Sequence, residues 1–193
     1  NPSLEDPAGF RRHWTKAHSM VNALLKKNPT APDTLLIAAR LERDHGDLDF
    51  YAPEPRLDAS QERYDMAIDR LDAFEAAQGN EVIAKTERSM VLTKLGDIAH
   101  ARGHSESASL LRRDVLTLER AIRDSKDTPE TRRNLAIALG RVASDALQRQ
   151  HPSEARDYFE RSFELRQRIA RELPNERRAM RDLANGHEWM GRV

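Results

Sequence analysis

Small residues recur in this chain at a spacing of about 47 positions. Gly96 and Ala108 are twelve residues apart, and Ala143 and Ala155 repeat that interval 47 residues later. Self-similarity at a fixed period indicates a repeat architecture, in which each unit buries its apolar face against the next one. The neighbouring positions repeat as well: Leu92, Leu95 and Ala99 correspond to Leu139, Val142 and Ala146, and Met190 with Gly191 begins a third copy.

Gly96 lies in a run of residues that otherwise favours helix. A glycine inside a helix costs about 1 kcal/mol relative to alanine. Two antiparallel helices approach closely where a side chain is nearly absent, and the added dispersion contacts then offset this cost. We therefore expect Gly96 to contact Ala108 across one helical hairpin, and Ala143 to contact Ala155 across another.

The chain reads as helix almost throughout, because proline and glycine fall between periodic segments and strand-like alternation is rare. Two helix starts carry capping signals: Thr128 precedes Pro129, and Thr30 with Asp33 imitates a capping box. The predicted helices span residues 10–27, 33–45, 60–78, 81–102, 105–124, 129–149, 152–173 and 176–193.

Two earlier segments match the second helix of a repeat. In each, an alanine is followed four and seven positions later by large apolar residues. These segments are Ala67, Leu71 and Phe74, and Ala17, Val21 and Leu24. Both predict buried helix faces.

Residues 47–59 are the main irregularity, with two prolines, four acidic residues and the adjacent rings of Phe50 and Tyr51. Insertions in repeat arrays map to loops and are often functional, so one interpretation is a loop that contacts a partner. The other interpretation, which we favour, is that Phe50 and Tyr51 pack back onto neighbouring helices.

The repeated positions resemble the tetratricopeptide repeat family. That family places Leu-Gly and then an aromatic residue on the first helix of each pair, and Ala-x3-Phe on the second. Leu95, Gly96 and Ala108 match this pattern in one unit, and Ala143, Ala155 and Phe159 match it in the next, with Ser162 at the following small position and Pro174 as the stop. Ala99 and Arg112 depart from the expected aromatic residues, and the period exceeds the usual length of about 34.

The resemblance is strongest over residues 81–193 and implies an all-α, right-handed α-solenoid of antiparallel helix pairs, of the extended-helix bacterial type. Residues 1–193 would form one repeat domain with an irregular first pair. The final "WMGRV" mirrors the start of a pair whose second helix is missing. We expect an exposed apolar face there, including Met190 and Trp189, and hence either a longer chain or a contact with a second copy.

Catalytic signatures are weak. The chain has no cysteine, no Gly-rich phosphate loop and neither G-x-S-x-G nor H-E-x-x-H. Glu42 and His45 form one Glu-x-x-His, which we interpret as part of a surface helix because a di-iron bundle needs two. His100 and His104 have ligand-like spacing, but Gly103 falls where the helix should end. We expect no enzyme activity, cofactor or metal.

Charge excludes other partner classes. Lys plus Arg and Asp plus Glu number 32 each, so the sequence predicts binding neither to nucleic acid nor to a membrane surface. We interpret the pairs Arg132–Arg133 and Arg177–Arg178 as solvated helix ends and ion-pair partners. No apolar run approaches the roughly 18 residues of a membrane span. The chain has 26 arginines and six lysines, which is typical of a GC-rich source, and we expect a bacterial, cytoplasmic protein.

What remains is a binding surface for a protein or peptide. If the family's geometry carries over, the first helix of each pair lines the inner groove, and amide, guanidinium and apolar groups there suit an extended or helical peptide. Arg141 is the expected anchor for a carboxylate. A second hypothesis is a sensory or docking part of a larger signalling enzyme or transcriptional regulator. The predicted lining consists of Met90, Thr93, Asp97, Asn134, Ile137, Arg141, Ser144, Asn185 and Glu188.

Overall fold

The computed structural model describes residues 7–192, and every regular element in that range is an α-helix. The helices fall into two compact units, Asn1–His104 and Ser105–Val193, which are described separately. None of the helices within residues 7–192 is both long enough and apolar enough to cross a membrane. The first unit contains α2 (Pro7–Lys27), α3 (Pro32–Phe50), α4 (Leu57–Ala76) and α5 (Glu81–Ala101), and the second contains α6 (Ser105–Ser125), α7 (Pro129–Gln148), α8 (Pro152–Glu172) and α9 (Arg177–Met190).

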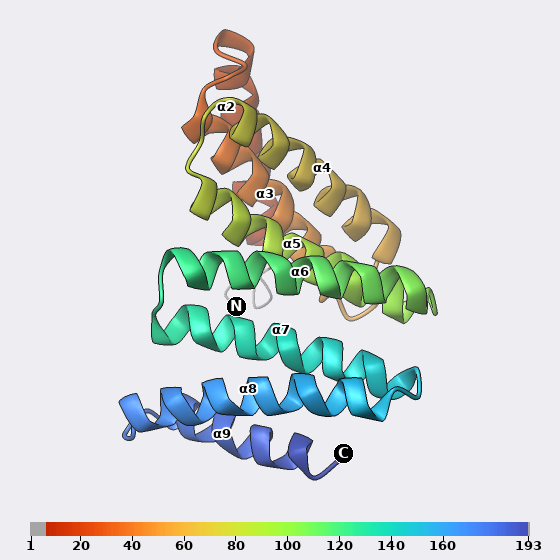
Figure 1. The fold of residues 1–193 in the computed structure, drawn as a ribbon. Helices are drawn as coiled ribbons and strands as arrows, with labels where there is room; N and C mark the ends of the chain where they lie inside the picture. The colour runs from red at the N-terminus through yellow and green to blue at the C-terminus, as the bar shows by residue number, and fades with distance from the viewer. Residues whose placement is uncertain (1–6, 193) are drawn as a thin grey trace. The chain divides into compact units, whose positions relative to one another are not determined.

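The all-α prediction is confirmed, and the predicted helix boundaries agree with the observed ones to within a few residues at most ends. Within each unit, helices that follow one another in the chain pack against one another (Figure 1). This sequential packing is the arrangement of a helical repeat. Whether residues 1–193 form one continuous repeat domain stays a prediction.

The hairpin of α7 and α8 is packed through small residues, as expected. Ala143 and Ala155 are fully buried and share one core cluster with Ala146 and Phe159. The buried hydroxyl of Ser162 also donates a hydrogen bond to the carbonyl oxygen of Ala136, at 2.7 Å. Ala143 and Ala155 therefore lie in one core between α7 and α8, as their predicted contact requires. The predicted contact of Gly96 with Ala108 would join the two units and stays a prediction.

Gly46 performs the corresponding role in the first unit. A β-carbon at this position of α3 would be 2.7 Å from the ring of Tyr64 on α4, closer than van der Waals contact permits. The ring of Tyr64 is fully buried, and its hydroxyl donates to Asp47 at 2.7 Å. The hydroxyl of Ser60 donates to the carbonyl oxygen of Gly46, so a buried serine ties this hairpin as well.

The earlier second-helix patterns are confirmed in part. Ala67, Leu71 and Phe74 are buried on α4. On α2, Val21 is buried but Leu24 is exposed, because the next residue, Leu25, completes the buried face instead. The spacing i, i+4 from Val21 to Leu25 keeps both side chains on one side of the helix.

Residues 47–59 are less irregular than the sequence suggests. Helix α3 continues to Phe50 and α4 begins at Leu57, so the connection between the helices is short. Phe50 packs against the cluster around Tyr64, as the favoured interpretation holds. Tyr51 remains 48% exposed, stacks edge-to-face on Phe50, and lies 4.3 Å from the ammonium of Lys94.

The two capping predictions have opposite outcomes. Thr128 caps α7 by accepting from the backbone N–H of Thr131, and the hydroxyl of Thr131 accepts from the backbone N–H of Thr128, which completes a capping box. The prediction for Thr30 is wrong. Ala31 occupies the N-cap of α3, and Thr30 instead bonds the side-chain oxygen of Asn28.

The expected exposed apolar face at the end of the chain is also wrong for both named residues. Trp189 and Met190 are half-buried against the cluster of α7 and α8. The guanidinium of Arg166 lies 4.6 Å from the centre of the Trp189 ring. Gly140 on α7 leaves room for this ring, because a β-carbon there would overlap it.

Candidate functional site

The predicted binding residues on α7 share one face of that helix. Asn134, Ile137, Arg141 and Ser144 recur at three- and four-residue intervals, which places them on one side. Ile137 is 37% exposed, a high value for an isoleucine in a helix where most other apolar side chains are buried. The other three are half-buried. This face is therefore both accessible and chemically mixed.

The predicted residues on α5 and α9 are accessible too. Met90 is 47% exposed, and Thr93 and Asp97 beside it are half-buried. Asn185 and Glu188 on α9 are exposed, and Glu188 forms an ion pair with Arg192. Each set occupies one face of its own helix; whether the sets bind one ligand stays a prediction.

Met90 and Ile137 occupy equivalent positions, 47 residues apart, and each unit keeps one of them exposed. Met90 also receives a contact from Arg43 on α3, whose guanidinium lies 3.5 Å from the thioether sulfur. Arg43 and Arg40 both bind Glu87, which is buried on α5. These ion pairs hold α3 and α5 together beside the exposed methionine.

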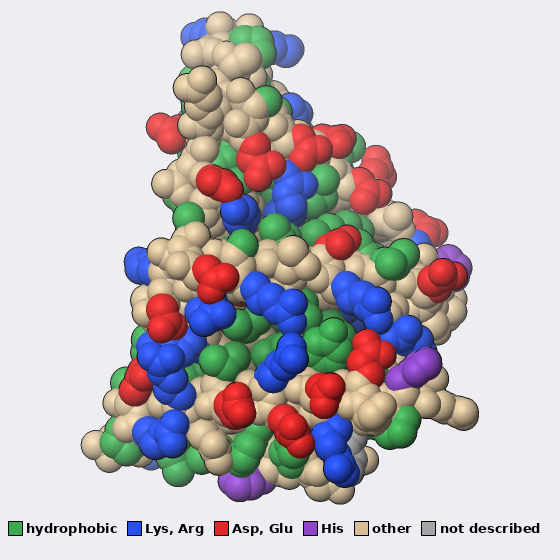
Figure 2. Space-filling model, in the orientation of Figure 1, with side chains coloured by type: hydrophobic (Ala, Val, Ile, Leu, Met, Phe, Trp, Pro, Cys, Tyr) green, Lys and Arg blue, Asp and Glu red, His purple; other side chains and the backbone are tan. Residues whose placement is uncertain are grey.

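A second surface, which the sequence analysis missed, is a hollow of about 340 Å³ in the second unit. Its walls come from α6 and α8, and its floor comes from α7. Figure 2 shows basic side chains beside apolar ones over these helices. The lining consists of Arg120, Arg123, Asp124, Leu135, Leu139, Arg161, Glu164 and Leu165.

The arginines of this hollow differ in how they are paired. Arg123 forms an ion pair with the adjacent Asp124 at 2.9 Å, but its Nε is buried without a hydrogen-bond partner. Arg120 and Arg161 make no ion pair with any residue in the range 7–192. Helical spacing alone groups Arg120 with Arg123, which are one turn apart. It does not group them with Arg161, which follows Arg123 by 38 positions.

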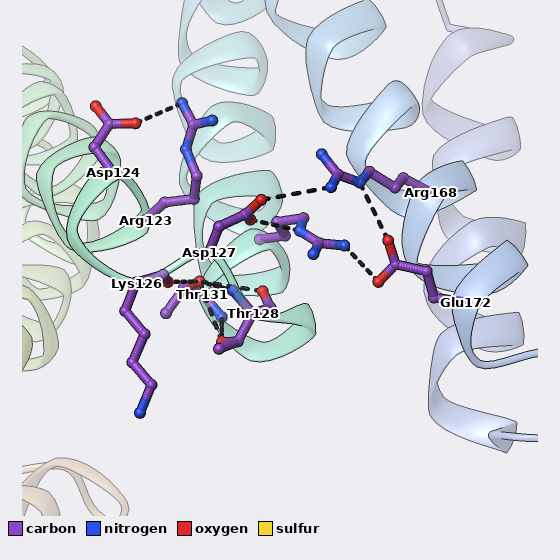
Figure 3. Close-up of polar contacts among 9 residues, drawn as sticks. Arg123, Asp124, Lys126, Asp127, Thr128, Thr131, Arg168 and Glu172 are labelled. Atoms are coloured by element: carbon purple, nitrogen blue, oxygen red, sulfur yellow. Dashed lines mark hydrogen bonds and ion pairs between the residues drawn. The ribbon is translucent and has the colours of Figure 1, made fainter.

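An ion network fixes the end of the α6–α7 hairpin against α8 (Figure 3). Arg132 donates to Asp127 and to Glu172, both at 2.6 Å. Arg168 bridges the same two carboxylates from α8. Hydrogen bonds from Arg132 lower the pKa of both Asp127 and Glu172, with a further contribution from Arg168.

The interpretation of Arg132–Arg133 as solvated helix ends is wrong in one respect. Both arginines are ion-paired, as expected, but their side chains are buried. Arg133 binds Glu130, Glu176 and Asp182, so a single guanidinium joins α7 to α9. Arg178 is exposed and lies 3.7 Å from Glu130.

The Glu-x-x-His of α3 is not a surface feature, because Glu42 is only 3% exposed. It accepts from His18 on α2 at 2.9 Å and from Arg63 on α4 at 3.0 Å. Trp14 stacks between the rings of His18 and His45, with centroids 4.5 and 4.2 Å apart. The pairing of His18 with Glu42 is not readable from the sequence, since α2 and α3 meet only in the folded structure.

His45 is the least satisfied member of this cluster. Its Nδ1 is buried without a hydrogen-bond partner. Burial lowers the pKa of His45, and the nearby positive charge of Arg63 lowers it further. Within residues 7–192, no group of three or more His, Asp or Glu side chains is arranged to hold a metal ion. The cluster therefore connects α2, α3 and α4 through ring stacking and one buried carboxylate.

Comparison of the chain with protein-family models gave no matching family, and comparison with curated proteins gave no match either.

Proposed function

We propose that this chain is a binding module for a protein or peptide, built on a tetratricopeptide-like helical repeat. Its ligand lies against the first helix of a pair, on the face that carries Met90 in one unit or on the equivalent face that carries Ile137 in the other. The exposure of these two equivalent apolar side chains is the observation that supports the proposal. The residues next to them in the sequence are buried: Ser89 and Val91 on α5, and Ala136 and Ala138 on α7.

The polar groups beside Ile137 make this face chemically suited to bind a peptide. Asn134 and Ser144 supply side-chain donors and acceptors that can satisfy a peptide backbone, while Ile137 buries an apolar side chain of the ligand. Arg141 supplies a fork of donors for a carboxylate. A face that combines apolar area with a few placed polar groups is typical of peptide-binding grooves.

The test begins with selection of peptides that bind the whole chain from a random library. The affinity of an enriched peptide is then compared between wild type and the variants Ile137→Glu and Met90→Glu. Leu110→Glu is the matched control, because Leu110 is an exposed leucine on a second helix, α6. We expect at least one of the first-helix variants to weaken binding by about tenfold, which corresponds to about 1.4 kcal/mol. Equal affinity for all four proteins contradicts the proposal.

A further inference from the structure

The hollow between α6 and α8 is a second candidate for binding, separate from the first-helix face. Leu135 and Leu139, which form its floor, are two residues away from Ile137 on either side. Two residues along an α-helix turn the side chain by about 200°, so the floor and Ile137 lie on opposite sides of α7. A ligand in the hollow therefore does not occupy the first-helix face.

The charges of the hollow favour an anionic ligand. Three guanidinium groups face two carboxylates, those of Asp124 and Glu164. Asp124 is already paired with Arg123. Arg120 and Arg123, one turn apart on α6, also repel each other, since like charges that neighbour on a helix surface destabilise the helix. A ligand carboxylate between them would relieve that repulsion.

The apolar part of the hollow distinguishes between anionic ligands. Its floor is closed by buried leucines, and Leu165 on α8 is half-buried beside Arg161. A nucleic acid gains affinity from many phosphate contacts, typically about six to ten, whereas this hollow offers three guanidinium groups around a leucine floor. An acidic peptide that carries an apolar side chain matches both properties.

We propose that the hollow lined by Arg120, Arg161 and Leu165 binds an acidic peptide segment, whose carboxylates pair with the arginines of α6 and α8 and whose apolar side chain packs on the leucine floor. The ion network of Asp127, Arg132, Arg168 and Glu172 holds the α6–α7 turn against α8. The spacing of the two arginine walls is thereby set before the ligand arrives, which reduces the entropic cost of binding.

The test uses a fluorescent synthetic peptide of about twelve residues, made of glutamates around two leucines four positions apart, so that both leucines share one helix face. Its binding to the whole chain is measured by fluorescence anisotropy. A peptide with lysines in place of the glutamates tests for charge, and an oligothymidylate tests for nucleic acid. We expect only the acidic peptide to bind, and to bind more weakly when NaCl is raised from about 50 to about 300 mM.

The variant R120E/R161E reverses both unpaired charges of the hollow. R171E/R181E is the matched control. Arg171 and Arg181 are exposed and have no ion-pair partner within residues 7–192, and their double substitution changes the net charge by the same amount as R120E/R161E. We expect R120E/R161E to weaken binding by about tenfold and the control to leave it within about twofold. The milder R120A/R161A, with circular dichroism for all variants, separates lost binding from lost folding.

Three results would overturn the proposal: no binding of the acidic peptide to wild type, equal weakening by both double substitutions, or binding of the oligothymidylate with the same dependence on Arg120 and Arg161. A shift of the Leu165 methyl resonances on addition of the acidic peptide supports it. The Ile137→Glu variant is expected to bind this peptide as wild type does, so failure of the first-helix proposal leaves this result unchanged.

Discussion

Trp189 of α9 lies directly against the backbone of Gly140 on α7, so closely that a β-carbon on residue 140 would overlap the indole ring. The ring also contacts Phe159, at a centroid distance of 5.7 Å, and receives the guanidinium of Arg166 on its face. Three helices of the second unit therefore meet at one side chain.

Gly140→Ala is expected to displace Trp189. Overpacking of this kind costs about 1–3 kcal/mol, and only about 1 kcal/mol returns through helix propensity. The free energy of unfolding should therefore fall, and one of the two tryptophan indole N–H resonances should shift. Gly191→Ala is the control, because a β-carbon there has no neighbour closer than 3.4 Å. An unshifted indole resonance in Gly140→Ala would contradict the packing described.

Thr128→Ala removes the capping box of α7. The backbone N–H of Thr131 then loses its acceptor, and N-cap losses of this kind cost about 0.5–2 kcal/mol. Urea denaturation measures the difference. Thr117→Ala is the matched control, because the exposed hydroxyl of Thr117 only donates to the carbonyl oxygen of Arg113 within the same helix. Equal losses for the two variants would show that the cap contributes nothing.

Ser162→Ala breaks the buried hydrogen bond from α8 to α7. The same hydroxyl accepts from Nε of Arg166 at 3.3 Å, so the substitution leaves a buried donor without that partner. We expect a loss of about 1–3 kcal/mol in the free energy of unfolding. Ser125→Ala, which removes an exposed hydroxyl bonded within its own helix, should change stability by less. The account of this hairpin fails if the order is reversed.

His45→Phe tests the buried histidine cluster through pH. Burial places the pKa of His45 in the folded chain below the ordinary value of 6.5, so the unfolded chain binds more protons. The stabilisation from neutral His45 is complete above that ordinary value and is lost as the pH falls through the lower folded-state pKa. Phenylalanine keeps the stacking on Trp14 but does not titrate.

The measurement is the free energy of unfolding at a pH above 6.5 and at one below it, for wild type and His45→Phe. We expect the wild-type value to decrease more than that of the variant as the pH falls. Identical pH dependence in the two proteins would mean that His45 titrates as it does in the unfolded chain.

Local signals predicted most of the fold. Pro129 and Pro152 begin α7 and α8, and Gly103 follows the end of α5 with a positive φ. Such signals act within a few residues, so they can be recognised in the sequence directly. The small residues Ala143 and Ala155 were recognisable because their spacing repeats. Gly140 was not singled out, since its role depends on a tryptophan 49 positions away, which only the folded unit brings near.

One of the two candidate surfaces could be predicted from local sequence signals, and the other could not. The exposed face of α7 follows from helical periodicity, which places Ile137 opposite the buried leucines. The arginine-lined hollow requires α6 and α8 to lie on either side of α7, and no local pattern encodes that arrangement. The buried positions of Glu42 and Arg133 were unexpected for the same reason, because their partners come from other helices.

Methyl NMR of the whole chain, titrated with a peptide selected for binding to it, tests the proposed binding face most directly. We expect the resonances of the Ile137 methyls or the Met90 ε-methyl to shift, while those of Met20 and Met66, which are exposed on α2 and α4, stay unchanged. Shifts confined to Met20 and Met66 would contradict the assignment of ligand binding to the first helices.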